Sequence, residues 1–278
     1  MFVVDSQVHL FPPDEPDAMN PLGHRTLRGT KLLKEMDTAR VDLAILIPPR
    51  IEAATNEDAL ATASRWPSRF GVVAKLRPDE CERSRDELSR WRGSGALGVR
   101  VSFPADSPGP GEDQANWLWR MAEDLETPVM VWCPGRVGEL ATVASRHPSV
   151  RIIIDHCGLS GDDRGARVGA VIREVGKLAG FTNIGVKASG LPDHSENRFP
   201  FRDLHEPIKR LVGDFGARRV FWGSDLTRLH CEYWEVVELF LSHLAFLSGS
   251  ELESVMGLGI CSWLNWRAPE PPHTDVQP

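Results

Sequence analysis

Ile152-Ile153-Ile154-Asp155-His156-Cys157-Gly158 is the stretch of this sequence that says most about its fold. Three consecutive isoleucines are typical of a strand that is buried on both faces, as in a parallel sheet. An aspartate and a histidine follow directly, at the point where such a strand ends. Ionisable groups in that position are expected at a rim of the sheet, because burying a charge without a partner is costly.

Two other segments have the same form. Val3-Val4-Asp5-Ser6-Gln7-Val8-His9 lies near the N-terminus, and Val220-Phe221-Trp222-Gly223-Ser224-Asp225 lies near the C-terminus. The carboxyl ends of all strands in a closed α/β barrel meet at one mouth, so side chains that are far apart in sequence share one pocket there. This pattern is the main reason to predict that the chain is an enzyme.

Short apolar runs alternate with amphipathic stretches along the chain, which predicts a repeated strand–helix unit. The predicted strands are Phe2–Ser6, Asp42–Ile47, Phe70–Leu76, Leu97–Phe103, Pro128–Cys133, Val150–Asp155, Asn183–Ala188 and Arg219–Ser224. The predicted helices are Arg28–Arg40, Asn56–Arg65, Asp79–Arg92, Gln114–Glu126, Val137–Ser145, Ala166–Ala179 and Arg202–Phe215, with a final pair over Cys231–Leu247 and Glu251–Trp263.

These elements predict an α/β protein, a single (β/α)8 TIM barrel with an extra C-terminal helix. An open, doubly wound sheet is the alternative, but it usually has a glycine-rich first turn, and residues 5–11 contain no glycine. We expect one domain over residues 1–267. The proline-rich tail 268–278 is expected to be poorly ordered.

Composition narrows the classes of function. The chain has 278 residues and a formal net charge of -7, which argues against a nucleic-acid surface, since that would need a basic face. No stretch approaches the length of apolar sequence that a membrane helix needs. The five cysteines are scattered and form no CxxC pair, which indicates neither a disulfide framework nor a structural zinc site. We therefore expect a protein of the reducing cytoplasm.

The predicted strand ends supply many polar side chains to one rim. In chain order they are Asp5, Gln7, His9, Arg100, Ser102, Trp132, Cys133, Asp155, His156, Lys187, Ser189, Ser224 and Asp225. Structural roles compete with functional ones at several of them. His9 could be a packing histidine, Asp225 could cap the next helix, and Cys133 is more typical of a small buried hydrophobe. Arg100 and Lys187 could point into the barrel or outward to the helices.

The sequence resembles the amidohydrolase superfamily, in particular the amidohydrolase-2 branch, which includes 2-pyrone-4,6-dicarboxylate lactonase, sugar lactonases and metal-dependent decarboxylases. The N-terminal segment resembles a D-x-H-x-H motif, and Leu97–Val101 resembles the family's GxR strand. Residues 154–158 are similar to the lactonases' IDHxG. Asn183–Leu191 resembles N-x-x-x-K-x-SG-L, and residues 222–225 match WGSD. The order of these motifs along the chain indicates the family.

The departures from the family pattern concern its metal ligands. Metal-binding members use two histidines on the first strand, one on the fifth and an aspartate on the eighth. Here Gln7 replaces the first histidine, and Trp132-Cys133 stands where the third is expected. A neutral amide is a poor ligand for a catalytic zinc ion. We therefore expect no cofactor, while one zinc or manganese ion held by His9, His156 and Asp225 remains the alternative.

The resemblance to metal-free lactonases implies a mechanism. Asp225 would be the general base that activates water, and His9 and His156 would polarise the carbonyl of a small cyclic ester or a related carboxylated ring compound. The expected substrate is a small anionic molecule. The predicted substrate-binding residues are Gln7, Arg100, Trp132, Cys133, Lys187, Ser189 and Arg228.

Two other functions remain open. A metal-dependent amidohydrolase or decarboxylase would use His9, His156 and Asp225 as ligands. A non-catalytic barrel would bind a ligand or assemble with a partner. No nucleic-acid or membrane partner is expected, and assembly into a homo-oligomer is left open.

Overall fold

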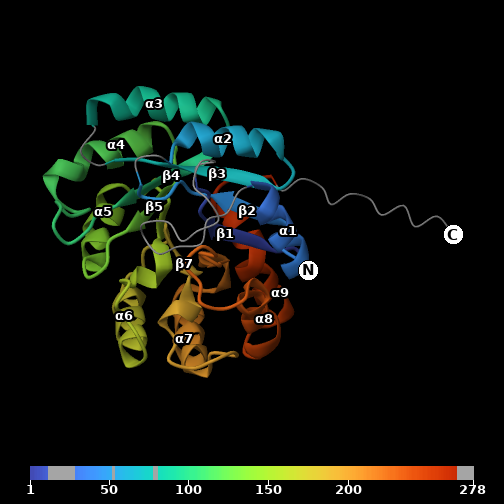
Figure 1. The fold of residues 1–278 in the computed structure, drawn as a ribbon. Coiled ribbons are helices and arrows are strands. Elements are labelled where there is room, and N and C mark those ends of the chain that lie inside the picture. Colours follow the sequence, from blue (N-terminus) through green and yellow to red (C-terminus); the bar gives the residue numbers. More distant parts are fainter. Residues whose placement is uncertain (12–28, 52–53, 78–80, 268–278) are drawn as a thin grey trace.

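Eight parallel strands form the centre of the protein. The computed structural model describes residues 1–11, 29–51, 54–77 and 81–267. Each strand pairs with the next along the chain, in the order β1-β2-β3-β4-β5-β6-β7-β8 (Figure 1). Their bounds are β1 Val4–Val8, β2 Leu43–Leu46, β3 Phe70–Lys75, β4 Ala96–Ser102, β5 Val129–Trp132, β6 Ile152–Ile154, β7 Ile184–Ser189 and β8 Val220–Gly223. The predicted (β/α)8 barrel is confirmed.

Side chains join the last strand to the first. The Asp5 carboxylate of β1 accepts the Ser224 backbone N–H at 2.8 Å and the Tyr233 hydroxyl at 2.6 Å. The Asp225 N–H donates to the Gln7 carbonyl oxygen at 2.9 Å. Burial raises the pKa of the Asp5 carboxyl, and these hydrogen bonds act in the opposite direction. Asp5 is therefore a buried link that holds the two ends of the sheet together.

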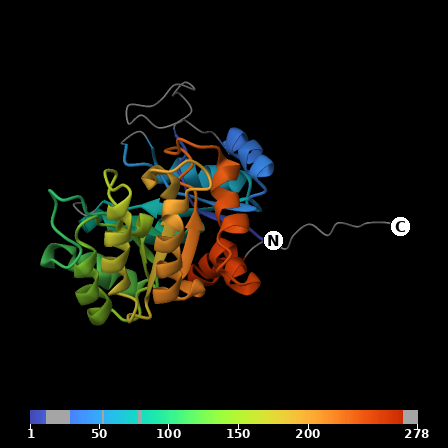
Figure 2. The same cartoon turned by 90° about the horizontal axis from the view of Figure 1, so that it is seen from below.

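Helices surround these strands. They are α1 Gly29–Ala39, α2 Asn56–Arg65, α3 Cys81–Gly93, α4 Asn116–Asp124, α5 Leu140–Arg146, α6 Ala166–Gly176, α7 His205–Phe215, α8 Tyr233–His243, α9 Gly249–Glu253 and α10 Gly259–Trp263, with a π-helical turn at Ser254–Leu258. Figure 2 shows α6, α7 and α8 side by side on the outside of the strands. The predicted helix starts at Arg28 and Asp79, and the tail 268–278, lie outside the described residues.

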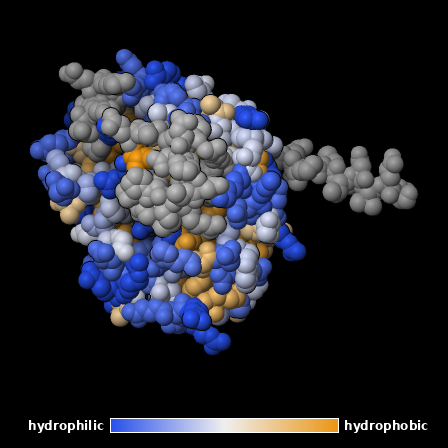
Figure 3. Space-filling view, in the orientation of Figure 1, coloured by the Kyte–Doolittle hydropathy of each residue, from blue (hydrophilic) through white to orange (hydrophobic). Residues whose placement is uncertain are grey.

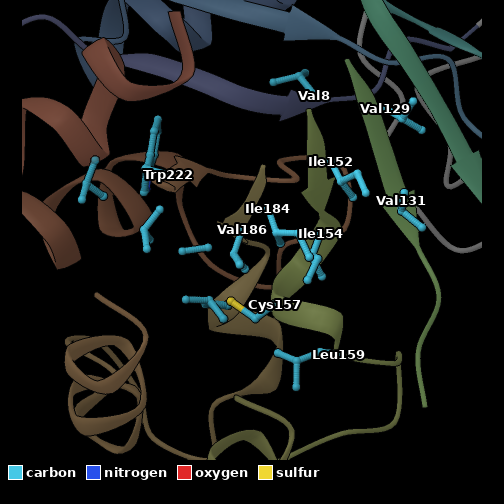
Figure 4. Packing of buried hydrophobic residues seen from close by; sticks show 14 of the residues in the cluster. Val8, Val129, Val131, Ile152, Ile154, Cys157, Leu159, Ile184, Val186 and Trp222 are labelled. Carbon is cyan, nitrogen blue, oxygen red and sulfur yellow. The ribbon is translucent and has the colours of Figure 1, made fainter. Parts of the chain in front are cut away.

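Alternation along the strands separates two layers of apolar side chains. Ile152 and Ile154 of β6 pack outward in the large cluster between strands and helices, whereas Ile153 belongs to a smaller cluster inside the barrel. Figure 4 shows the outer layer, with Val129 and Val131 of β5 beside the isoleucines. Because successive side chains of a strand point alternately inward and outward, only every second residue near the end of a strand can reach the mouth.

The surface in Figure 3 is mostly hydrophilic over the described residues. The large hydrophobic side chains described as exposed are Met1, Trp234 and Leu258. Among the described residues, no helix is both long enough and apolar enough to cross a membrane.

Candidate active site

Three predicted catalytic side chains meet at the carboxyl end of the barrel. His9 follows β1, His156 lies in a short 3-10 segment after β6, and Asp225 follows β8. His9 Nε2 lies 3.3 Å from Asp225 Oδ1, and His156 Nδ1 lies 3.9 Å from Asp225 Oδ2. All three side chains are buried. The strands thus place one carboxylate between two imidazoles.

The backbone at this site is strained. His156, Cys157 and Asp225 have φ values of 51°, 52° and 53°, in the left-handed region that non-glycine residues seldom occupy. Gly190 lies close to Asp225 and His156, and a Cβ built there would lie 3.4 Å from the Asp225 Cβ. Such strain persists only where the surroundings hold it in place, and it is common at functional sites.

Asp225 and His156 have shifted pKa values. Burial acts to raise the pKa of Asp225, and the electrostatic influence of the neighbouring His156, His9 and Arg228 side chains lowers it below the usual value. Burial lowers the pKa of His156 to about 4. At neutral pH, therefore, Asp225 is ionised and His156 is neutral. This combination suits a base and a neutral hydrogen-bond donor.

A buried ionic cluster lies beneath the three catalytic candidates. Asp155 Oδ2 accepts Arg100 Nε at 2.6 Å, and Asp155 Oδ1 lies 2.7 Å from Lys187 Nζ. Burial acts to raise the pKa of the Asp155 carboxyl, but Lys187 and Arg100 lower it well below its usual range. Burial lowers the pKa of the Lys187 ammonium, and Asp155 opposes that shift. Both Arg100 and Lys187 thus point into the barrel rather than to the helices.

Gln7 connects this cluster to His9, and Ser189 contacts His156. Lys187 Nζ donates to the Gln7 amide oxygen, and Gln7 Nε2 lies 3.2 Å from His9 Nε2. The Ser189 hydroxyl lies 3.0 Å from His156 Nδ1. The sequence placed Gln7, Lys187 and Ser189 among substrate contacts. In the structure their contacts are with other site residues, and all three side chains are buried.

A cavity of about 650 Å³ opens beside the cluster, over the ends of β2, β3 and β4. Its lining includes Arg50, Arg77 and Arg100, with Asp106 as its acidic member. The Arg50 guanidinium lies 5.3 Å from the centre of the Trp132 ring. Sequence reasoning missed Arg50, because it follows β2 in a loop without any motif. The loop after β4 also lines this cavity, through Pro104, Asp106, Ser107 and Pro108.

Trp132 and Arg228 also lie near the mouth. Trp132 is partly exposed, and its indole N–H donates to the Leu159 carbonyl oxygen at 3.2 Å. Arg228 Nε lies 3.8 Å from Asp225 Oδ2, and its side chain is 32% exposed. Arg228 is therefore an accessible cation next to the candidate base.

Cys133 does not face the mouth. It is completely buried in the apolar layer between the strands and the helices. Burial raises the pKa of its thiol to about 12. A side chain in that layer cannot touch a substrate at the mouth, so the predicted binding role of Cys133 needs correction. The alternation along β5 brings Trp132, not Cys133, to the pocket side.

The donor set does not fit a divalent ion in this arrangement. Gln7 turns its amide nitrogen, which is not a metal ligand, toward His9 Nε2, while Lys187 holds its oxygen. His156 Nδ1 faces the Ser189 hydroxyl. Within the described ranges, no group of three or more His, Cys, Asp or Glu side chains is arranged to hold a metal.

Comparison with known proteins defines the class of this barrel. A sequence model of the amidohydrolase family, of the amidohydrolase-2 type, matches residues 4–272. The chain therefore belongs to the amidohydrolase family, as its motifs indicated, and it is an enzyme of the amidohydrolase superfamily.

The similar proteins include one lactonase by sequence and two amidohydrolase-like proteins by structure. The chain is 37% identical over 108 residues to L-fucono-1,5-lactonase of Burkholderia ambifaria. The matched stretch covers 38% of this chain and 36% of that protein. A putative 2-pyrone-4,6-dicarboxylic acid hydrolase from Pseudomonas putida has a TM-score of 0.78 at 19% identity, covering 96% of this chain and 98% of that one. An amidohydrolase from Burkholderia multivorans with bound zinc gives a TM-score of 0.78 at 18% identity, covering 95% and 99%. At 18–19% identity, the likeness to these two structures shows only that the fold is shared.

Proposed function

We propose that this enzyme hydrolyses a small cyclic ester that carries a carboxylate, and that it does so without a metal. The observation that carries the proposal is the position of Asp225. Its Oδ1 atom is buried at the mouth between β1 and β8 and has no hydrogen-bond partner among the described residues. An ionised carboxylate in that state is suited to accept a proton from a bound water.

In the proposed reaction, Asp225 takes a proton from the water as its oxygen attacks the carbonyl carbon. The carbonyl oxygen becomes an oxyanion, and the ester C–O bond then breaks. Cleavage of this bond opens the ring, and the leaving oxygen takes the proton that Asp225 removed from the water, which restores the Asp225 carboxylate. The neutral His156 ring would stabilise the oxyanion by donating a hydrogen bond. Its Nδ1 lies 3.0 Å from the Ser189 hydroxyl and 3.4 Å from the Ser189 carbonyl oxygen. Arg228 would add a positive charge on the same side.

The anionic part of the substrate would bind in the cavity over β2, β3 and β4. Arg50 and Arg100 line this cavity, and Arg100 is held in place by Asp155. Planar guanidinium groups bind carboxylates through paired, charge-assisted hydrogen bonds. Lys187 is not assigned to the substrate, because its ammonium group is buried against Asp155 and Gln7.

The lactonase relative supports hydrolysis of a cyclic ester, although its match spans only about a third of either chain. The contact between Gln7 and His9 supports a metal-free reaction, because the Gln7 amide nitrogen, which is not a metal ligand, lies 3.2 Å from His9 Nε2. Lactones also need less electrophilic assistance than amides, which is consistent with the loss of two ligand positions from the family pattern.

The proposal is tested with a panel of substrates. The purified full chain is assayed against carboxylated 2-pyrones, neutral aldonolactones, carboxylated phenols and small cyclic amides, by proton release and by product mass. Ring opening with addition of one water to a carboxylated lactone is the expected result. Loss of carbon dioxide from a phenol carboxylate, or turnover confined to cyclic amides, would contradict the proposal.

A further inference from the structure

A continuous chain of polar contacts runs inside the barrel from the cavity to Asp225. It passes from Arg100 to Asp155, Lys187, Gln7, His9 and Asp225. Every member is buried, and Lys187 and Asp155 are fully so. In such surroundings each hydrogen must have an acceptor, because an unmatched polar group is costly. The donors and acceptors along the chain can therefore be assigned one by one.

Lys187 determines the orientation of the Gln7 amide. A lysine ammonium has only donors, so the Gln7 atom that it contacts must be the amide oxygen. The amide NH2 then faces His9 Nε2, at 3.2 Å. The reverse orientation would place the NH2 group against the ammonium, with donors on both sides. The Asp155 carboxylate at 2.7 Å keeps the positive charge on Lys187.

The orientation of Gln7 in turn determines which nitrogen of His9 carries the proton. His9 Nδ1 lies 2.7 Å from the Ile47 carbonyl oxygen, which can only accept, so Nδ1 bears a hydrogen. His9 Nε2 receives the N–H of Gln7 and must offer its lone pair. The contacts on both sides of the ring therefore select a neutral imidazole protonated at Nδ1.

We propose that Lys187 and Gln7 are positioning residues that hold His9 as the Nδ1-protonated neutral ring. In this form His9 Nε2 cannot donate to Asp225 Oδ1, 3.3 Å away, and the carboxylate keeps its acceptor for water. The Gln7 N–H occupies the lone pair of His9 Nε2. Asp225 Oδ1 is then the acceptor that orients the water molecule, while carbonyl polarisation falls to His156. This inference assigns the histidine roles within the proposed hydrolysis and rests on that function for its catalytic consequence.

The proton position can be measured without a substrate. Long-range ¹H–¹⁵N correlation spectra of the ¹⁵N-labelled full chain at neutral pH distinguish the two neutral tautomers and the imidazolium, and a His9→Asn spectrum assigns the signals. We expect His9 to show a protonated Nδ1 and an unprotonated Nε2. A protonated Nε2 in the wild-type protein would overturn the proposal, whatever the substrate is.

Gln7→Glu is the sharpest variant, because it keeps the shape of the side chain and an oxygen for Lys187. Its second carboxylate oxygen can only accept, so His9 Nε2 should gain a proton and turn it toward Glu and Asp225. The His9 signals should change accordingly, and kcat should fall at least tenfold with KM nearly unchanged. Unchanged His9 signals in this variant would contradict the proposal.

Two further variants separate positioning from general damage. Lys187→Met removes the ammonium that orients Gln7, so His9 should show a mixture of tautomers, and a single unchanged tautomer would count against the proposal. Asn265→Asp makes the same amide-to-carboxylate change at an exposed residue that contacts Arg151. It should leave both the His9 signals and kcat unchanged. Normal His9 signals in a wild-type protein inactive on every lactone would refute the proposed function, not the tautomer assignment.

Discussion

The Lys187 ammonium lies 2.7 Å from Asp155 Oδ1 in the interior of the barrel, where neither side chain has any exposed surface. Arg100 holds the other oxygen of the same carboxylate, at 2.6 Å. Two cations and one anion are thus buried together. Removing the anion leaves two positive charges without compensation, which is far more costly than losing an exposed pair.

Asp155→Asn should therefore destabilise the fold strongly. We expect the free energy of unfolding to fall by about 3–5 kcal/mol, as is usual when one partner of a buried ion pair is removed. Urea denaturation followed by circular dichroism measures the change. Asp214→Asn, which breaks the partly exposed pair with Arg210 on α7, is the matched control and should cost less than about 1 kcal/mol. Equal effects of the two substitutions would show that the Asp155 charge is not needed in the barrel.

The same carboxylate should make stability depend on pH. The Asp155 pKa is lower in the folded state than in the unfolded state, where it is about 3.9. Its contribution to stability is then fully present above the unfolded pKa and is lost as the pH falls toward the folded pKa. Between pH 5 and pH 2, the wild-type protein should lose more stability than Asp155→Asn, as measured by urea titrations at each pH. Parallel curves for the two proteins would contradict this assignment.

Cys133 should be unreactive in the folded protein. Burial and a thiol pKa raised to about 12 leave only about one thiolate in ten thousand at pH 8, and no reagent has access to it. After brief treatment with iodoacetamide, peptide mass spectrometry should find Cys133 unmodified in the native chain and fully modified after denaturation. Rapid alkylation of the native protein at Cys133 would place this thiol at the mouth after all.

Arg50→Met should weaken substrate binding without affecting the fold. Loss of a charge-assisted hydrogen bond costs about 1.5–3 kcal/mol, or roughly ten- to a hundredfold in affinity. We therefore expect KM for a carboxylated lactone to rise by that factor while kcat changes little. Arg100→Met should act in the same direction. Arg90→Met on α3, whose guanidinium pairs with Glu57, is the control with unaltered kinetics. An unchanged KM in both cavity variants would show that Arg50 and Arg100 do not bind the anionic group of the substrate.

Removal of metal ions should not abolish hydrolysis. Gln7 and Cys133 stand where imidazole ligands are expected. His9 contacts Gln7 and the Ile47 carbonyl oxygen, and His156 contacts Ser189. Purified protein should contain well under one transition-metal ion per chain by elemental mass spectrometry. Its rate should survive dialysis against a chelator. A near-stoichiometric zinc or manganese content, with activity lost on chelation and restored by the ion, would favour the metal-dependent alternative.

The sequence predicted the barrel because its signals are local and repeated. Apolar runs such as Ile152–Ile154 mark strands, and the polar residues after them mark the mouth. The direction of Arg100 and Lys187 could not be predicted, because a strand buried on both faces shows no alternation. Which residues of each strand face the barrel interior is known only once the neighbouring strands are placed in register. Cys133 was misplaced for the same reason.

The roles of Asp155 and Gln7 were also hidden from the sequence. Asp155 lies within a lactonase-like motif, but its partners Arg100 and Lys187 come from other strands. No spacing rule connects them. Arg50 follows a strand without any motif and became a candidate only through its position over Trp132. Contacts between distant strands therefore account for most of what the sequence left open.

The most direct test of the proposed function is the kcat of Asp225→Asn on the best lactone substrate. Asn is nearly isosteric with Asp and cannot accept the proton, so the substitution tests proton transfer more than packing. We expect kcat to fall at least a hundredfold, within the usual range for loss of a general base, with the melting temperature nearly unchanged. A variant that keeps most of the wild-type kcat would show that Asp225 is not the base.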